Sequence, residues 1–435
     1  MIIKYIEKKI NFPFLLAYSG GLDSTFLLYQ LLKIKKIRPQ LTFRAIHINH
    51  QLHEQSYQWS EHCKKTCEKN NISLIIKKIV INKKKIGIEA AARFQRYKAI
   101  QEEISPQEII LTAHNLNDQC ETFLLALKRG SGITGLSGIS YQRTFFKNNI
   151  IIRPLLNITR SEIKSWIIKK KISWIKDISN YDTIYDRNFL RHKILPLLTK
   201  RWPSFIKKCA KSAFILAQEK KILYSTLKKQ LEKYLISNSI LCIASFKNLE
   251  LEMRNSLLRM WFKINNCTIP SYRIIHNIYY EIILSKPDSK AKIIIKNYEI
   301  RRYRQNLYLI KILPCIKHLI LIWNKPWNAL KLPNNLGYIT KNKFGTILPY
   351  PKKNELINIR FQVSGHFLIQ NCSKKKSISK IWKEHRIAPW NRNNIPLLFY
   401  NNNLISALGV FTVSQKERNI RNCTWNISWI NNIEN

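Results

Sequence analysis

A loop of small and polar residues near the N-terminus has the composition of an anion-binding site. It reads Ser19-Gly20-Gly21-Leu22-Asp23-Ser24 and follows an apolar run at residues 14–18. Adjacent glycines let the backbone turn sharply near an anion, and a helix that begins there points free N–H groups at it. A carboxylate repels phosphate, so Asp23 indicates a Mg²⁺ ion that neutralises phosphate charge. The loop predicts a phosphate site, without the G-x-x-x-x-G-K-S/T pattern of a Walker A loop.

A second group of polar side chains consists of His114, Asp118 and Glu121. Residues three or four apart lie on one face of a helix, so a helix here would present the imidazole and both carboxylates together. The alternative for such a His–Asp pair is a surface hydrogen bond or a helix cap. We favour a functional role, because the group follows an expected strand and would lie opposite the glycine loop.

Two arginines, Arg93 and Arg96, lie one helical turn apart on an alanine-rich segment. Their alternative is a solvated helix face, on which Glu89 would pair with Arg93.

Short apolar runs that alternate with helical patterns must position these side chains. Strands are expected at about 14–18, 41–48, 72–80 and 108–112, and helices at about 24–32, 55–70, 87–100 and 117–128. Such alternation predicts a parallel sheet with helices on both faces. Ligands of such sheets bind at the carboxyl ends of the strands, where the glycine loop and His114 fall.

The pattern of strand-like and helix-like segments changes twice along the 435 residues, and we therefore expect three domains. Residues 1–202 would form a Rossmann-like α/β domain with a parallel sheet, 203–325 a mainly helical middle domain, and 326–435 a small α+β domain. Within the middle, 203–262 shows helical periodicity without strand alternation, and β-like runs begin at about 290. The Pro- and Asn-rich stretch 326–354 is expected to be a linker or loops.

Charge and cysteine content bound the function. A net charge of +48 and a pI near 10.1 attract polyanions, although mutational bias toward lysine is the alternative explanation. The nine cysteines include no CxxC pair, and Cys63 and Cys67 are expected as buried thiols one helical turn apart rather than as metal ligands. Neither an apolar run of about 18 residues nor a signal-peptide pattern is present, so we expect a cytoplasmic protein without a membrane partner.

Several strings resemble a known family. S-G-G-x-D-S at 19–24 is similar to the PP-loop of N-type ATP pyrophosphatases, which cleave ATP to AMP and pyrophosphate while adenylating a substrate. Further segments resemble the tRNA(Ile)-lysidine synthetase family, namely 87–97, 112–122, 127–137 and 177–191. In the last domain the similar strings are Lys380-Ile381-Trp382, Pro389-Trp390 and 395–400. The resemblance thus covers the first and last expected domains.

The resemblance implies a two-step reaction on a minor isoleucine tRNA with the anticodon CAU. ATP, with Mg²⁺, would adenylate the C2 oxygen of the wobble cytidine. The amine of free lysine would then displace AMP and leave lysidine, which pairs with A rather than G and changes codon reading from AUG to AUA.

The resemblance also implies roles for individual residues. The ATP-binding residues would be Ser19, Gly20, Gly21, Leu22, Asp23 and Ser24. The catalytic residues would be Asp23, His114, Asp118 and Arg93, with Mg²⁺ held by Asp23 and Asp118. Candidates for contacts with lysine or the cytidine are Arg96, Glu121 and Arg129, and the division of roles between Arg93 and Arg96 stays open. Candidates for tRNA contacts are Arg187, Arg191, Lys374, Lys375 and Lys380.

One departure from the family pattern weakens a metal role for position 117. The family has a second His and a second Asp where this chain has Asn115 and Asn117, so Asp118 is expected to take that role. One alternative function is a PP-loop tRNA thiolase, for which the chain offers no clear sulfur-carrying Cys. Another is a catalytically weakened tRNA-binding protein, favoured only by these two asparagines. The oligomeric state is open, and a homodimer is one alternative.

Overall fold

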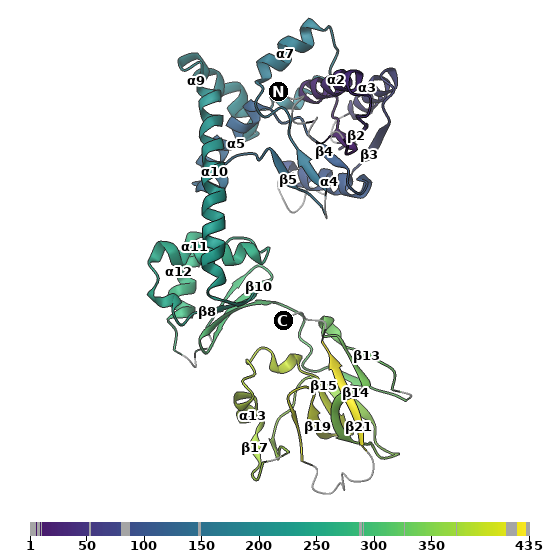
Figure 1. Ribbon diagram of the computed structural model, residues 1–435, viewed down its shortest axis with the longest axis vertical. Coiled ribbons are helices and arrows are strands. Elements are labelled where there is room, and N and C mark those ends of the chain that lie inside the picture. The colour runs from purple at the N-terminus through teal and green to yellow at the C-terminus, as the bar shows by residue number, and fades with distance from the viewer. Residues whose placement is uncertain are drawn as a thin grey trace. The chain divides into compact units, whose positions relative to one another are not determined.

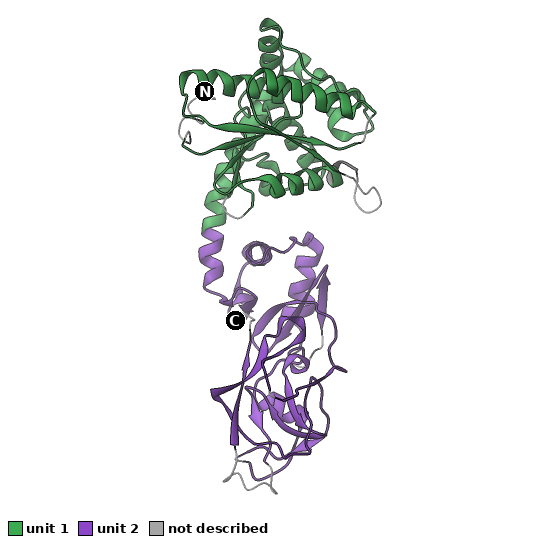
Figure 2. Cartoon of the chain, turned by 90° about the vertical axis from the view of Figure 1, so that its right-hand side faces the viewer, with its two compact units in different colours: residues 1–225 green, residues 226–435 purple. Residues whose placement is uncertain are grey.

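The computed structural model describes two compact units, residues 1–225 and 226–435 (Figure 2). The described residues are 6, 9, 11–51, 54–79, 88–146, 149–286, 289, 291–325, 327–370, 372–414 and 424–431, with only the backbone of 88–90. None of the helices in these ranges is both long enough and apolar enough to cross a membrane. The division into domains at 202 and 325 stays a prediction.

The first unit is built on a sheet whose described strands have the order β3-β2-β1-β4-β6-β5 (Figure 1). Its strands are β1 (Phe14–Ala17), β2 (Phe43–Asn49), β3 (Leu74–Lys78), β4 (Ile109–Leu111), β5 (Gln142–Thr144) and β6 (Ile150–Ile152). Neighbouring strands are parallel, except that β5 and β6 are antiparallel. The Rossmann-like parallel sheet predicted from the sequence is confirmed.

Helices cover both faces of this sheet. In chain order, the helices that begin in this unit are α2 (Leu22–Ile37), α3 (Ser56–Lys69), α4 (Ile88–Glu103), α5 (Leu116–Lys128), α6 (Ile133–Leu136), α7 (Arg160–Lys169), α8 (Asp186–Phe189), α9 (Leu195–Arg201) and α10 (Phe205–Glu232), with the short turns η1 (Ile178–Tyr181) and η2 (Leu190–Ile194). Of these, α9 and α10 pack against α5 rather than on the sheet. Successive strand side chains point to opposite faces, so Phe14 and Leu16 pack among side chains of α2, α3 and α7. Leu15 faces the other way and packs with Ile100 of α4.

The first part of the second unit combines helices with an antiparallel sheet of order β7-β8-β11-β10-β9. Its elements are β7 (Leu235–Ser237), β8 (Ile240–Cys242), η3 (Phe246–Asn248), α11 (Leu251–Ile264), α12 (Tyr272–Asn277), η4 (Ile278–Ile283), β9 (Lys292–Ile295), β10 (Tyr298–Tyr303) and β11 (Asn306–Lys311). The predicted helices are confirmed, and so are the β-like runs after 290. The prediction that 203–262 lacks strands is wrong, because β7 and β8 are too short to show an alternating pattern.

The last part of the chain consists mainly of antiparallel strands. These elements are β12 (Ile320–Ile322), β13 (Leu330–Lys331), η5 (Pro333–Asn335), β14 (Tyr338–Pro349), β15 (Ile357–Arg360), β16 (His366–Phe367), β17 (Lys376–Ser377), α13 (Ile378–Glu384), η6 (Arg392–Asn394), β18 (Leu397–Tyr400), β19 (Asn403–Ala407), β20 (Phe411–Thr412) and β21 (Thr424–Ile430). The expectation of a linker at 326–354 is wrong, since β14 pairs with β21. A register shift between Lys341 and Thr346 interrupts β14 and hides its period in the sequence.

Candidate active site

The glycine loop lies where β1 ends and α2 begins, and its hydroxyl groups hold it in shape. Ser19 Oγ lies 3.1 Å from Ser24 Oγ, and the Ser24 hydroxyl donates to the Gly21 carbonyl oxygen at 3.1 Å. Thr25 Oγ1 donates to the carbonyl oxygen of Gly20, also at 3.1 Å. The N-terminus of α2 therefore faces a preformed turn, and its free N–H groups and dipole favour an anion there.

Gly20 cannot be replaced by a larger residue without a shift in the loop. Its φ is +76°, and a Cβ atom built there would lie 2.3 Å from Ile175 Cδ1 and 2.8 Å from Cys63 Sγ. Ile175 is held against the loop because its backbone N–H donates to the Gly20 carbonyl oxygen at 2.9 Å. Backbone conformation and packing thus both require glycine at this position.

Asp23 is joined to the helix that follows β4 by a single amide side chain. Asn115 Nδ2 donates to Asp23 Oδ1 at 3.0 Å, and Asn115 Oδ1 accepts from the backbone N–H of Asp118 at 3.1 Å. Asp118 Oδ2 in turn accepts from the backbone N–H of Asn115 at 2.9 Å, which completes a capping box at the start of α5. Burial, reinforced by the charge of Asp118, raises the pKa of Asp23. Two carboxylates therefore lie close together across the cap.

His114 lies before α5 rather than on it, so the prediction of one helical face for His114, Asp118 and Glu121 is wrong. Asn115 takes the N-cap position, and the helix begins at Leu116. His114 Nδ1 lies 3.0 Å from Thr112 Oγ1. Burial lowers the pKa of His114 to about 4, against the charge of Asp118. Its imidazole is therefore neutral at pH 7 and can donate a hydrogen bond from one ring nitrogen and accept one at the other.

Arg191 connects the two carboxylates of α5. It donates from Nε to Glu121 Oε1 at 2.8 Å, from Nη2 to Glu121 Oε2 at 3.0 Å, and from Nη2 to Asp118 Oδ1 at 3.2 Å. Glu121 is fully buried, and Arg187 Nε lies 3.9 Å from its Oε2. Burial raises the pKa of Glu121, while the Arg191 charge opposes that shift. A buried carboxylate with a bidentate guanidinium is the arrangement that keeps both groups charged.

Three further residues at this site make contacts that the sequence did not predict. Arg153 follows β6, is 3% exposed and donates to the Ser140 carbonyl oxygen at 2.6 Å. Arg160 begins α7, and its charge opposes the rise that burial causes in the pKa of Asp23. Asn117 Oδ1 accepts from the backbone N–H of Arg160 at 3.0 Å. An arginine directly after an apolar strand, as in Ile152-Arg153, was the signal that could have revealed the first of them.

The other predicted residues of the first unit are exposed. Arg93 lies over the Tyr97 ring, 5.6 Å from its centroid, and its charge contributes to the low pKa of His114. Arg96 Nη2 lies 3.3 Å from His50 Nε2. Arg129 Nε donates to the Leu125 carbonyl oxygen at 2.9 Å, one turn back on α5. The side chain of Glu89, the expected partner of Arg93, lies outside the described residues.

The cysteines near the site are buried thiols. Cys63 and Cys67 lie one turn apart on α3, as predicted, and Cys63 Sγ is 3.4 Å from His47 Nδ1. Cys120 packs with Leu195 and Cys209, because that face of α5 meets α9 and α10.

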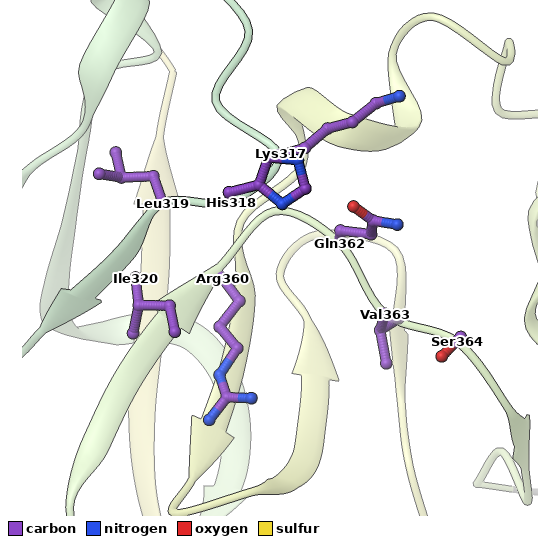
Figure 3. A pocket seen from close by; sticks show the side chains of 8 residues that line it. All are labelled: Lys317, His318, Leu319, Ile320, Arg360, Gln362, Val363 and Ser364. Atoms are coloured by element: carbon purple, nitrogen blue, oxygen red, sulfur yellow. The ribbon is translucent and has the colours of Figure 1, made fainter.

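The three lysines of the second unit that were predicted to contact tRNA are exposed. They are Lys374, Lys375 and Lys380. Trp382 is buried in the core, and the Trp390 ring contacts Tyr308 at 5.1 Å between centroids. A hollow of about 310 Å³ lies elsewhere in this unit, where Lys317 and Arg360 extend in opposite directions (Figure 3). These two cations therefore do not converge on one ligand.

Comparisons with known proteins extend over the whole chain. Three family models match: a PP-loop domain at 2–198, a TilS substrate binding domain at 241–308, and a TilS substrate C-terminal domain at 357–429. Each range falls within one predicted domain. A tRNA(Ile)-lysidine synthase of Buchnera aphidicola subsp. Baizongia pistaciae is 53% identical over 435 residues, which cover 100% of this chain and 99% of the relative. The protein of that name from Salmonella typhimurium is 38% identical, with 92% and 93% covered.

Proposed function

This chain belongs to the tRNA(Ile)-lysidine synthase family, and we propose that the carboxyl edge of its parallel sheet joins free lysine to a cytidine of tRNA(Ile). The PP-loop domain makes it an ATP-using ligase. The observation that carries the residue assignment is the approach of Asp23 and Asp118 across Asn115, beside the glycine loop.

The proposed reaction has two steps. In the first, the C2 oxygen of the wobble cytidine attacks the α-phosphorus of ATP, and the bond to pyrophosphate breaks. In the second, the lysine amine attacks C2, the bond between C2 and the AMP oxygen breaks, and the amine loses a proton. The protein must hold the triphosphate, balance the charge of the leaving group and orient the base.

The glycine loop, the N-terminus of α2 and Arg160 are suited to hold the triphosphate. The backbone of 19–24 leads into the N-terminus of α2, where N–H groups and the helix dipole favour phosphate oxygens. Arg160 lies close enough to act on the charge of Asp23, and its Nη1 is buried with no hydrogen-bond partner among the described residues. A phosphate oxygen would satisfy this atom, so we assign Arg160 to the phosphates together with the loop.

Asp23 and Asp118 fit a Mg²⁺ ion. Carboxylate oxygens together with substrate phosphates are the ligands that this ion usually takes in nucleotide sites. Burial and the charge of Asp118 raise the pKa of Asp23, and a divalent cation would relieve that repulsion. When bound, the ion would neutralise the charge that develops on pyrophosphate. Position 117 is used differently, since the Asn117 side chain caps the first N–H of α7.

The remaining polar and charged groups would orient Asp118, the base and the lysine. We assign Arg191 and Glu121 to the orientation of Asp118, because the guanidinium bridges both carboxylates. Neutral His114 is suited to a hydrogen bond with the cytidine, and exposed Arg93, Arg96 and Arg129 to the lysine carboxylate or the α-phosphate.

The partners and setting complete the proposal. Exposed Lys374, Lys375 and Lys380 lie in the part that matches the TilS substrate C-terminal domain, and would contact tRNA phosphates together with Arg187. ATP, lysine and tRNA as substrates favour the cytoplasm. A homodimer is supported by the exposed apolar side chains Phe214 and Ile222 on α10, and sedimentation would test it.

Labelled lysine tests the reaction. We expect the purified chain to transfer label from lysine to a tRNA(Ile) transcript with the anticodon CAU, with ATP converted to AMP in equal amount. A transcript whose wobble cytidine is replaced by uridine is the matched control and should stay unlabelled. Turnover of ATP that ignores lysine would contradict the proposal, and sulfur transfer to the transcript would favour a thiolase.

A further inference from the structure

We propose that an exposed apolar surface beside the active site holds unstacked anticodon-loop bases of the tRNA next to the reacting cytidine. This apolar platform consists of Ile178, Tyr181, Ile184, Tyr185 and Phe189. Ile184 is 88% exposed and Tyr181 is 66% exposed. The inference rests on the proposed function, because its ligand is part of the same tRNA.

The number of large apolar side chains in this short segment calls for a partner. Single exposed apolar residues are ordinary on protein surfaces, whereas groups of them mark interaction sites. All five platform residues lie between Ile178 and Phe189, in the turn η1, the connection after it and α8. Burial of these side chains by a ligand would remove apolar area from water and stabilise the complex.

Hydrogen bonds hold the backbone of the platform in one conformation. The Asp177 carboxylate accepts from the backbone N–H of Ser179 at 2.9 Å, and the Asp182 carboxylate accepts from that of Ile184 at 3.0 Å. Asn188 Nδ2 donates to the carbonyl oxygens of Ser179 and Asp182 at 3.0 Å and 2.9 Å. A surface that is already ordered loses little conformational entropy when a ligand binds.

The same segment is attached to α5, the helix that carries Asp118 and Glu121. Asp186 accepts from Lys128 Nζ of α5 at 2.8 Å. Arg187 and Arg191, which follow the platform's first residues, reach Glu121 on the same helix. A base that packs on the platform would therefore lie next to a cytidine bound at the carboxyl edge of the parallel sheet.

The platform side chains themselves carry no charge, so they suit bases rather than phosphates as the ligand. Of the carboxylates beside them, those of Asp177 and Asp182 accept backbone N–H groups, and that of Asp186 is paired with Lys128. Every base has an aromatic face that stacks on tyrosine or packs on isoleucine, whatever its sequence. Reaction at C2 requires the cytidine to leave its stack, which also exposes the faces of its neighbours.

Substitution of the most exposed platform residue tests the inference. Ile184→Ser should weaken binding of the CAU transcript by about ten- to a hundredfold, the range for loss of one buried apolar side chain of this size. Ile184→Tyr should bind at least as tightly as the wild type. The matched control is Ile37→Ser. Ile37 is the last residue of α2, away from the glycine loop, and is 56% exposed. Binding is measured by fluorescence anisotropy over a series of salt concentrations, and melting temperatures confirm that each variant is folded.

Two features of the result identify the ligand. The slope of log Kd against log salt should not change, because no phosphate contact is lost. On a transcript with abasic nucleotides on both sides of the wobble cytidine, Ile184→Ser and the wild type should bind within about twofold, since no neighbouring base is left to stack.

Three results would overturn the inference: binding of Ile184→Ser that equals that of Ile37→Ser, an unchanged effect on the abasic transcript, or a change of association state that shows a second copy of the chain on the platform. If the proposed function is wrong, the wild type will not transfer lysine to the transcript. That result is measured independently of the binding experiments.

Discussion

The two basic regions of this chain use their cations in different ways. At the carboxyl edge of the first unit, Arg191 is bonded to Glu121 and Asp118, and Glu121 is fully buried. In the second unit, Lys374 and Lys375 are exposed to solvent. Charges that are paired and partly buried are screened little by salt, whereas exposed charges are screened strongly. The first region is therefore suited to fixed geometry, and the second to long-range attraction of a polyanion.

The largest expected effect in this comparison follows from removal of Arg191. Arg191→Met leaves the buried Glu121 carboxylate without its bidentate partner, and we expect the free energy of unfolding to fall by about 3–5 kcal/mol. Urea denaturation measures the change. The double variant with Glu121→Gln should recover part of the loss, because no buried charge is then left unpaired. Full stability of Arg191→Met would mean that the pair is not structural.

Asp23→Asn should separate catalysis from stability. We expect the rate of AMP formation to fall by about 100- to 1000-fold, as when a single group that stabilises developing charge is removed. The substitution also relieves the repulsion that contributes to the raised pKa of Asp23, so the melting temperature should stay the same or rise. A quenched-flow assay gives the rate and calorimetry gives the melting temperature. A loss of both would indicate that Asp23 is needed for folding.

Asn115 has two functions that different substitutions separate. Asn115→Ala removes the cap of α5, and we expect a loss of about 1 kcal/mol in the free energy of unfolding. Asn115→Ser keeps a capping hydroxyl but lacks the amide that donates to Asp23, so stability should recover while activity stays low. Equal activity of the serine variant and the wild type would show that the contact with Asp23 has no catalytic use.

The smallest effect on the protein itself is expected from the exposed lysines. Replacement of Lys374, Lys375 and Lys380 by Ala should change the free energy of unfolding by no more than about 0.5 kcal/mol. The slope of log Kd for tRNA against log salt should fall by about 1 for each lysine that contacts a phosphate. Anisotropy titrations at several salt concentrations measure this slope. An unchanged slope would place the contacts elsewhere on the surface.

The fold of the first unit could be predicted because its signals are local. A buried run such as 14–18 and the glycine loop after it specify a strand, a turn and a helix start without help from distant residues. β14 was missed because its pairing with β21 depends on residues about 80 positions away and includes a register shift.

The site could be predicted only in part, because residue types do not reveal their partners. Asp23 and Asp118 follow strands of a parallel sheet, and the topology alone predicts that they meet. Arg191 looked like a surface cation, since nothing in the sequence shows that η2 turns it toward Glu121. His114 was placed on a helix because helical spacing does not show that Asn115 would act as the N-cap.

The central claim is that Asp23 and Asp118 suffice for catalysis in a chain with asparagine at 117. Single-turnover rates of lysidine formation by Asp118→Asn and Asn117→Asp test it directly. We expect Asp118→Asn to lose about 100-fold or more. Asn117→Asp should stay within about threefold of the wild type, because an aspartate oxygen can accept the same bond from Arg160 at the N-terminus of α7. A large gain of rate from Asn117→Asp, or an unchanged rate for Asp118→Asn, would contradict the account.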